Sequence, residues 1–162
     1  MSDFSRMFIK NNGNPIVYNG KTLIMADRLA IEKEFKAEIE LISVNSRWRQ
    51  GISFSTKGKI DVGDGLIGPN HIFWQELWTE KNMGPIIING TSKDGIFFIY
   101  NSWYEDGCEQ AWVRNAAMIK EVIGENEYVY HCNDGDWDED FDDIVFRVKI
   151  LEGAKWKTKG TV

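Results

Sequence analysis

Residues 131–150 read HCNDGDWDEDFDDIVFRVKI, an acidic segment that runs directly into an apolar one. From Ile144 to Leu151, every second residue is apolar and the alternate positions include Arg147 and Lys149. This period of two is typical of a half-buried β-strand. The first thirteen residues of the stretch instead contain seven acidic side chains, whose mutual repulsion the fold must offset. A hard cation would do so, and Ca²⁺ takes roughly six to eight oxygen ligands.

The acidity is confined to this segment. The 162 residues include 25 acidic and 19 basic side chains, a formal net charge of −6. Outside the segment, 18 acidic residues stand against the 19 basic ones, so the remainder is close to neutral. A uniformly acidic chain would indicate solubility or a basic partner, whereas a local excess predicts a metal site. A net negative charge without a basic cluster also argues against nucleic acid as a partner.

Outward from this stretch, short segments rich in aromatic and β-branched residues recur between Gly, Pro and Asn. Their regular spacing predicts a single all-β domain over 1–162, an antiparallel β-sandwich or barrel. One helical turn is expected at 27–34, residues 101–107 are expected to form an exposed loop, and 110–122 fits either a helix or a strand. The expected strands are 16–18, 35–44, 48–55, 59–62, 86–88, 96–100, 127–132 and 144–150.

The chain shows no signal for membrane insertion or for a disulfide framework. No segment approaches the roughly 18 consecutive apolar residues of a transmembrane helix. The N-terminus lacks the basic and then apolar segments of a signal peptide, which predicts a cytoplasmic protein or export without a classical signal. Cys108 and Cys132 are too few for a disulfide framework. They either pair across neighbouring strands or remain two buried thiols.

Aspartates recur at every second position of the acidic loop. In an extended segment, this spacing turns the side chains to one side, where they can surround one Ca²⁺ or two that share carboxylates. Trp137 and Phe141, at intervening positions, would anchor the loop to the core. The five aspartates are Asp134, Asp136, Asp138, Asp140 and Asp142.

Two other acidic motifs do not fit. With Asp134 at the first position of an EF-hand, Glu139 occupies the sixth, where Gly is required, and Val145 the twelfth, where Glu is required. The segment DEDFD at 138–142 is similar to the aspartate-rich motif of terpene synthases, but that motif requires a helix in a large all-α fold. Both assignments are rejected.

Residues 134–148, DGDWDEDFDDIVFRV, resemble the calcium loop of the small bacterial fucose- and mannose-binding β-sandwich lectins. Their pattern is roughly EDGxDxDYNDAV, followed by a strand. In that family the loop carboxylates hold two adjacent Ca²⁺ ions, and sugar hydroxyls complete the coordination. The resemblance implies that Phe141 packs under the loop and that four residues are ligands: Asp138, Asp140, Asp142 and Asp143.

The chain also departs from the family's pattern. Asn133 stands where the family has a ligand Glu, Asp142 stands where Asn is usual, and one extra residue precedes Asp138. The family ends in a glycine whose carboxylate reaches a partner subunit's calcium, which implies a homo-oligomer, whereas this chain continues to Val162. The full set of candidate metal ligands is Asn133, Asp134, Asp136, Asp138, Asp140, Asp142 and Asp143.

Aromatic residues provide a second lead, because their faces stack on the C–H patches of sugars. Trp74, Trp78 and Trp112 are either part of such a surface or part of the core. The expected loop 101–107, NSWYEDG, carries the most exposed cluster. The candidate ligand-binding residues are Asn101, Trp103, Tyr104 and Trp137.

These patterns predict a calcium-dependent, lectin-like protein whose partner is a carbohydrate or glycoconjugate. One alternative is an acidic β-domain that binds a basic protein, as inhibitor and immunity proteins do. Another is a membrane-binding, cytolysin-like module, and in both alternatives calcium is structural or absent. No enzyme is predicted: His131 and Cys132 are adjacent on an expected strand and so point to opposite faces. Nothing selects a general acid from the seven acids of the loop.

Overall fold

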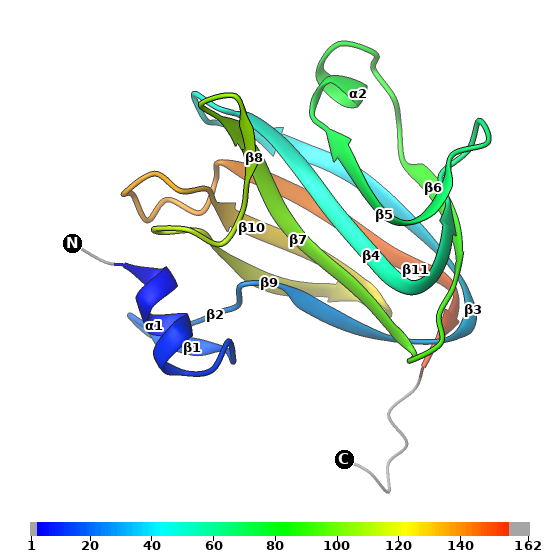
Figure 1. The fold of residues 1–162 in the computed structure, drawn as a ribbon, viewed down its shortest axis with the longest axis horizontal. Helices are drawn as coiled ribbons and strands as arrows, with labels where there is room; N and C mark the ends of the chain where they lie inside the picture. Colours follow the sequence, from blue (N-terminus) through cyan, green and yellow to red (C-terminus); the bar gives the residue numbers. More distant parts are fainter. Residues whose placement is uncertain (1–2, 156–162) are drawn as a thin grey trace, which may run out of the picture.

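Eleven strands and two short helices form residues 3–155, the part of the chain that this computed structural model describes (Figure 1). The antiparallel pairing and the layered arrangement confirm the predicted all-β sandwich. The helices are α1 (Phe4–Lys10) and α2 (Glu76–Thr79). The strands are β1 (Ile16–Tyr18), β2 (Lys21–Leu23), β3 (Asp27–Val44), β4 (Arg49–Asp61), β5 (Ile67–Trp74), β6 (Ile86–Thr91), β7 (Ile96–Glu105), β8 (Cys108–Gln110), β9 (Ala117–Gly124), β10 (Glu127–Asn133) and β11 (Ile144–Ala154).

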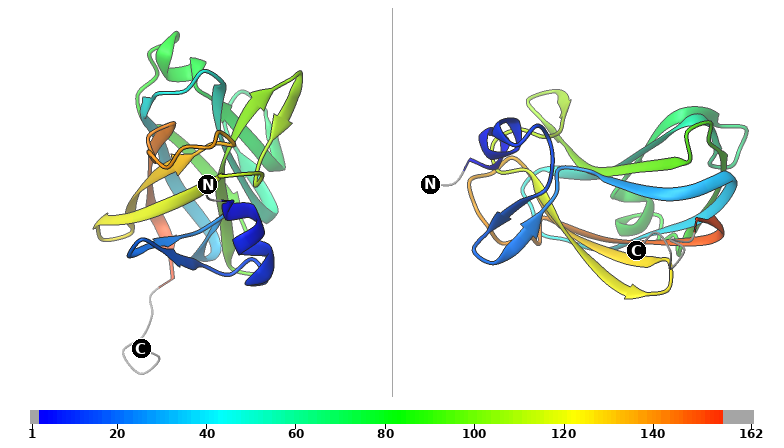
Figure 2. Two further views of the ribbon diagram at one scale, coloured as in Figure 1. Left: turned by 90° about the vertical axis from the view of Figure 1, so that its left-hand side faces the viewer. Right: turned by 90° about the horizontal axis from the view of Figure 1, so that it is seen from below.

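One long strand, β3, links the two layers. Nine strands form a sheet in the order β8-β7-β4-β6-β3-β11-β10-β9, with β5 added beside β4. The first part of β3 pairs with β7 and a later part pairs with β6, while β11 runs along its other side. The sheet therefore folds over on itself, and Figure 2 shows its two layers from the edge.

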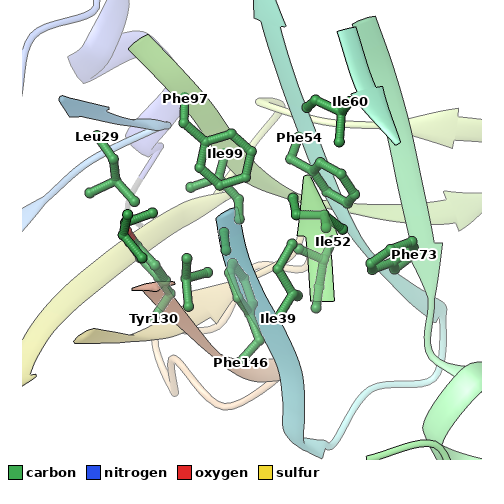
Figure 3. Packing of buried hydrophobic residues seen from close by; sticks show 14 of the residues in the cluster. Leu29, Ile39, Ile52, Phe54, Ile60, Phe73, Phe97, Ile99, Tyr130 and Phe146 are labelled. Carbon is green, nitrogen blue, oxygen red and sulfur yellow. The ribbon is translucent and has the colours of Figure 1, made fainter. Parts of the chain in front are cut away.

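The core lies between these layers and follows the period of two. On β11, Ile144, Phe146, Val148 and Ile150 are buried. Aromatic rings pack against one another in the interior (Figure 3): Tyr130 and Phe146, paired on the neighbouring strands β10 and β11, stack with ring centroids 5.1 Å apart. Each such large apolar side chain contributes about 1.5–3 kcal/mol on burial.

Three predictions of local structure were wrong. Residues 27–34 form the start of β3, because Leu29 and Ile31 point alternately into the core and the strand pairs with β7, which overrides the helical preference of Ala, Glu and Lys. Segments 48–55 and 59–62 belong to the single strand β4, whose pairing with β5 is irregular between Ser55 and Ile60. The loop expected at 101–107 is considered with the site below. For 110–122 the sequence allowed a helix or a strand, and the structure has a strand, β9, that begins at Ala117.

The helix α1 was not predicted, although its signals are present. The Oδ1 of Asp3 accepts a hydrogen bond from the amide of Arg6 (3.2 Å) and caps the helix. Phe4 and Phe8, one turn apart, share a face and are buried. They join the β1–β2 hairpin in a second, smaller core cluster with Ile16, Leu23, Ala117 and Phe141.

Both cysteines are free thiols, so the disulfide alternative is not realised. Cys132 is buried as expected, whereas Cys108 is exposed on β8. Within residues 3–155, no helix is long and apolar enough to cross a membrane.

Candidate metal and ligand site at the acidic loop

The acidic loop joins β10 to β11 at the end of the sandwich where α1 lies (orange in Figure 1). Phe141 fixes its centre, as predicted: the residue is buried with φ +54°, and its ring lies 6.0 Å from that of Phe4. Trp137, the other expected anchor, is instead 44 % exposed. The loop is therefore anchored through Phe141 to the smaller core cluster around α1 and the β1–β2 hairpin.

Asp134 is fully buried and binds protein donors. Its Oδ2 accepts hydrogen bonds from Ser46 Oγ (2.5 Å) and Gln50 Nε2 (3.1 Å), and its Oδ1 accepts one from the amide of Asp136 (2.9 Å). The backbone bends at 135–137, 141 and 143, so the loop is not extended. The expected ladder of five aspartates on one side was therefore wrong.

Asn133 and Asp143 also serve the loop's own structure. The side chain of Asn133 accepts from the amide of Phe141 (2.7 Å) and donates to the carbonyl of Asp138 (3.0 Å). Asp143 Oδ2 accepts from the amide of Asp134 (2.9 Å). Both candidate ligands are buried and hydrogen-bonded to backbone groups of the loop, so their role is to stabilise its conformation.

The carboxylates nearer the surface are only partly matched by donors. Asp136 forms an ion pair with Arg47 (3.4 Å), and Asp142 Oδ2 accepts from Asn45 Nδ2 (2.9 Å). Asp140 is exposed. Asn45 and Arg47 both lie in the β3–β4 turn, which therefore provides a hydrogen-bond donor and a positive charge to the loop.

Two buried carboxylate oxygens have no hydrogen-bond donor among the described residues: Asp138 Oδ1 and Asp142 Oδ1. A buried acceptor without a donor is unfavourable, so such atoms call for an unseen partner such as a water or an ion. Within residues 3–155, however, no three acidic, histidine or cysteine side chains already surround one point as in a preformed metal site. The loop thus offers acceptors to a cation without enclosing it in advance.

The crowding raises the pKa of two aspartates. Burial, followed by the charges of the neighbouring aspartates, raises the pKa of Asp138 to about 6. Burial is also the main cause for Asp143, whose pKa rises to about 8; the charge of Asp134 adds to the rise and the Asp134 amide opposes it. Asp143 therefore keeps its proton near neutral pH, and the fold offsets part of the repulsion by retaining protons.

The loop expected over 101–107 was wrong, because β7 continues to Glu105. Trp103 is fully buried, with its Nε1 donating to Glu105 Oε1 (2.9 Å), and Asn101 is buried and donates to the carbonyl of Asn133 (2.9 Å). A ligand at this surface would therefore not touch Trp103 or Asn101. Of the four candidate ligand-binding residues, Tyr104 and Trp137 are accessible, each 44 % exposed.

Residues from distant segments also support the loop, and no sequence pattern marks them. Arg114 donates through Nε to the carbonyl of Gly135 (2.5 Å) and pairs through Nη2 with Glu105 (2.5 Å). A Cβ at Gly135 would lie 2.6 Å from both Arg114 and Trp103, so glycine is required there for close approach. Comparison of the chain with family models, with curated proteins and with solved structures finds no match.

Proposed function

We propose that this chain is a calcium-binding, lectin-like β-sandwich that uses the acidic loop to bind carbohydrate. The observation that carries the proposal is the pair of buried carboxylate oxygens without donors, on Asp138 and Asp142. Both belong to the part of the loop that resembles the lectin calcium loop. Carboxylate oxygens without donors are the ligands that Ca²⁺ prefers.

Asp138, Asp140 and Asp142 would hold the ion, because Asn133, Asp134 and Asp143 are occupied by internal hydrogen bonds. When bound, the ion supplies positive charge against these carboxylates and coordination positions that sugar hydroxyls can take. Three carboxylates leave some of its roughly six to eight positions to water or ligand. The exposed ring of Trp137 stands in the same loop, where it can contact a sugar face.

Calcium titration by calorimetry on EDTA-stripped protein tests the metal directly. We expect micromolar binding and a raised melting temperature, since a ligand that binds only the folded state stabilises it. Asp138→Asn and Asp142→Asn should each weaken binding at least about tenfold, because each removes one charged ligand. Asp64→Asn is the matched control: it removes an exposed charge from the β4–β5 turn at a position with φ +52°, which Asn tolerates.

A glycan array read with and without Ca²⁺ then separates a lectin from a protein with structural calcium. Calcium-dependent glycan binding supports the full proposal. Calcium binding without any glycan supports a structural ion alone. No heat and no change in melting temperature would exclude calcium at this loop.

A second candidate is an electrostatic docking surface for a basic protein. It is favoured by the lack of a preformed metal cluster among residues 3–155, since exposed carboxylates can meet basic groups without converging. Complementary charge of this kind chiefly raises the association rate. Asp136→Lys and Asp138→Lys would then slow association with a basic partner equally in Ca²⁺ and in EDTA.

A further inference from the structure

We propose a second, calcium-independent binding site for neutral carbohydrate on the outer face of the layer formed by β4, β5 and β7. In this layer β4 is flanked by β5 and β7 (Figure 1). A hollow of about 280 Å³ is lined by residues of these three strands and of β8. Most of its lining residues are polar: the lining consists of Ser53, Phe54, Ser55, Asn70, His71, Ile72, Tyr100 and Glu109.

This hollow is separate from the acidic loop. Successive residues of a strand point to opposite faces, so Ser53 and Ser55 project from the side of β4 opposite to Gln50. Gln50 is the inward-facing residue that binds Asp134 of the loop. The sheet layer therefore stands between the loop and the hollow, and a ligand in the hollow would not touch the calcium ligands.

The base of the hollow contains hydroxyl groups that are held in fixed positions. Ser53 Oγ and Ser102 Oγ are hydrogen-bonded at 2.7 Å, and both residues are buried. The hydroxyl of Tyr100 lies near Ser53 and Glu109. These groups are held in place before any ligand arrives, which lowers the entropic cost of binding.

The upper polar groups are free to bind a ligand. In the part of the chain that the structure describes, no hydrogen bond engages the side chains of Ser55, Asn70 and Glu109, and the latter two residues are exposed. An amide, a carboxylate and a hydroxyl together provide both donors and acceptors. Sugar hydroxyls, each a donor and an acceptor at once, match such a set.

Two further aromatic rings lie next to residues that line the hollow: Trp112 packs against Tyr100, and Trp74 is two residues beyond Ile72 on β5. Trp112 lies 4.4 Å from Tyr100, ring centroid to centroid, and its Nε1 donates to the carbonyl of Met25 (2.9 Å), so the indole is fixed although it is 37 % exposed. Towards the other end, Trp74 packs edge-on to Tyr104. Gly51 permits this arrangement, because a Cβ there would come within 2.9 Å of the Trp74 ring.

Polar groups between partly exposed rings favour a sugar over other small ligands. The rings offer faces to the C–H patches of a pyranose, and the central side chains pair with its hydroxyls. The hollow contains the carboxylate of Glu109 and no lysine or arginine, and the Nε2 of its one histidine, His71, is bonded to the backbone carbonyls of Ile60 and Gly68, so a phosphorylated ligand would find no free cation there. Its volume of about 280 Å³ is just below the usual range for ligand sites, so it fits one sugar ring of a longer chain.

An array of neutral glycans probed in EDTA tests this site. We expect at least one glycan to bind, and its titration into ¹⁵N-labelled protein should shift the amides of 53–55, 70–72, 100 and 109 but not those of 134–143. Asn70→Ala and Glu109→Gln should each weaken binding about tenfold, the effect of losing a hydrogen bond to the ligand. Both residues are exposed, so the variants should melt like the wild type.

Glu125→Gln, an exposed carboxylate in the β9–β10 turn, is the matched control and should bind normally. The proposal is overturned if no neutral glycan binds in EDTA, if binding requires Ca²⁺, if the shifts fall on the acidic loop, or if both hollow variants bind like the wild type. Calcium calorimetry without sugar tests the acidic loop separately, so either proposal can fail alone.

Discussion

At the scale of single residues, the acidic loop contains carboxylates with different surroundings. Asp134 accepts three hydrogen bonds and Asp136 pairs with an arginine, whereas Asp138 and Asp142 each keep one buried oxygen without a donor. Asp143 is the most enclosed carboxyl with a raised pKa. Sequence spacing treats these aspartates as equivalent, but their burial and their donors make them differ.

Asp143 should make the stability of the protein depend on pH. Its folded pKa of about 8 lies above the value of about 3.9 for an unfolded aspartate. Between about pH 4 and pH 8 the folded state thus binds the extra proton, and its stabilising effect is lost as the pH rises through this window. We expect the melting temperature in EDTA to fall between about pH 5.5 and pH 8.5, and the fall to be smaller in Asp143→Asn.

Melting curves of the two proteins, recorded across that range in the same buffers, provide the measurement. The relevant quantity is the difference between wild type and Asp143→Asn, because other titrating groups are common to both. A difference that does not change with pH would show that Asp143 is not protonated in the folded state.

At the scale of elements, α1 and the β1–β2 hairpin act as a support for the acidic loop. Phe4 is fully buried and stacks against Phe141, the centre of the loop. Tyr18 on β1 reaches the same loop, and its hydroxyl donates to Glu139 (3.0 Å). The N-terminal unit therefore controls how firmly the loop is held.

Phe4→Ala should destabilise the protein by about 3–5 kcal/mol, the usual effect of removing a buried aromatic ring. The calcium affinity of the loop should fall as well, because Phe141 loses its neighbour. Urea denaturation and calorimetry measure the two effects. Ile9→Ala, on the exposed side of the same helix, should change neither; equal effects of the two substitutions would contradict this account.

The elements also show where sequence reasoning succeeds. The alternation in β11 and in the later part of β3 reflects burial between two layers, so these strands were predictable. Residues 101–104 were assigned to a loop because Asn101 and Ser102 are polar, but both are buried and hydrogen-bonded, Asn101 to the carbonyl of Asn133 and Ser102 to Ser53. The turn itself lies only at Asp106-Gly107, both with positive φ, which is the usual sequence of a tight hairpin turn.

At the scale of the whole molecule, the fold brings together groups that are distant in sequence. Asn45, Ser46 and Arg47 meet the acidic loop only because β3 and β11 are neighbours. No local pattern marks those three residues, so this half of the site could not be predicted. The acidic loop was predictable because its composition is exceptional.

A cluster of ion pairs centred on Arg147 links the three neighbouring strands β3, β11 and β10. Arg147 on β11 pairs with Glu38 (2.6 Å) and Glu40 (3.1 Å) on β3 and with Glu127 (3.1 Å) on β10. Arg147→Met keeps most of the apolar stem but leaves three carboxylates close together. We expect a loss of roughly 1–3 kcal/mol, below the figure for a fully buried pair because water reaches these groups.

The free energy of unfolding of Arg147→Met, measured in urea at about pH 7, tests this expectation. Lys149→Met, two residues along the same face of β11, is the comparison and should have a small effect. If Arg147→Met were as stable as the wild type, the cluster would contribute nothing to holding the strands together.

The exposure of Cys108 makes the protein convenient for site-selective labelling. Cys132 is buried, so a maleimide dye should attach to the native protein at Cys108 alone. That thiol is adjacent to Glu109 in the chain and belongs to the β7–β8 hairpin. A dye sensitive to its surroundings would thus report glycan arrival in the hollow by a change in emission, without any mutation.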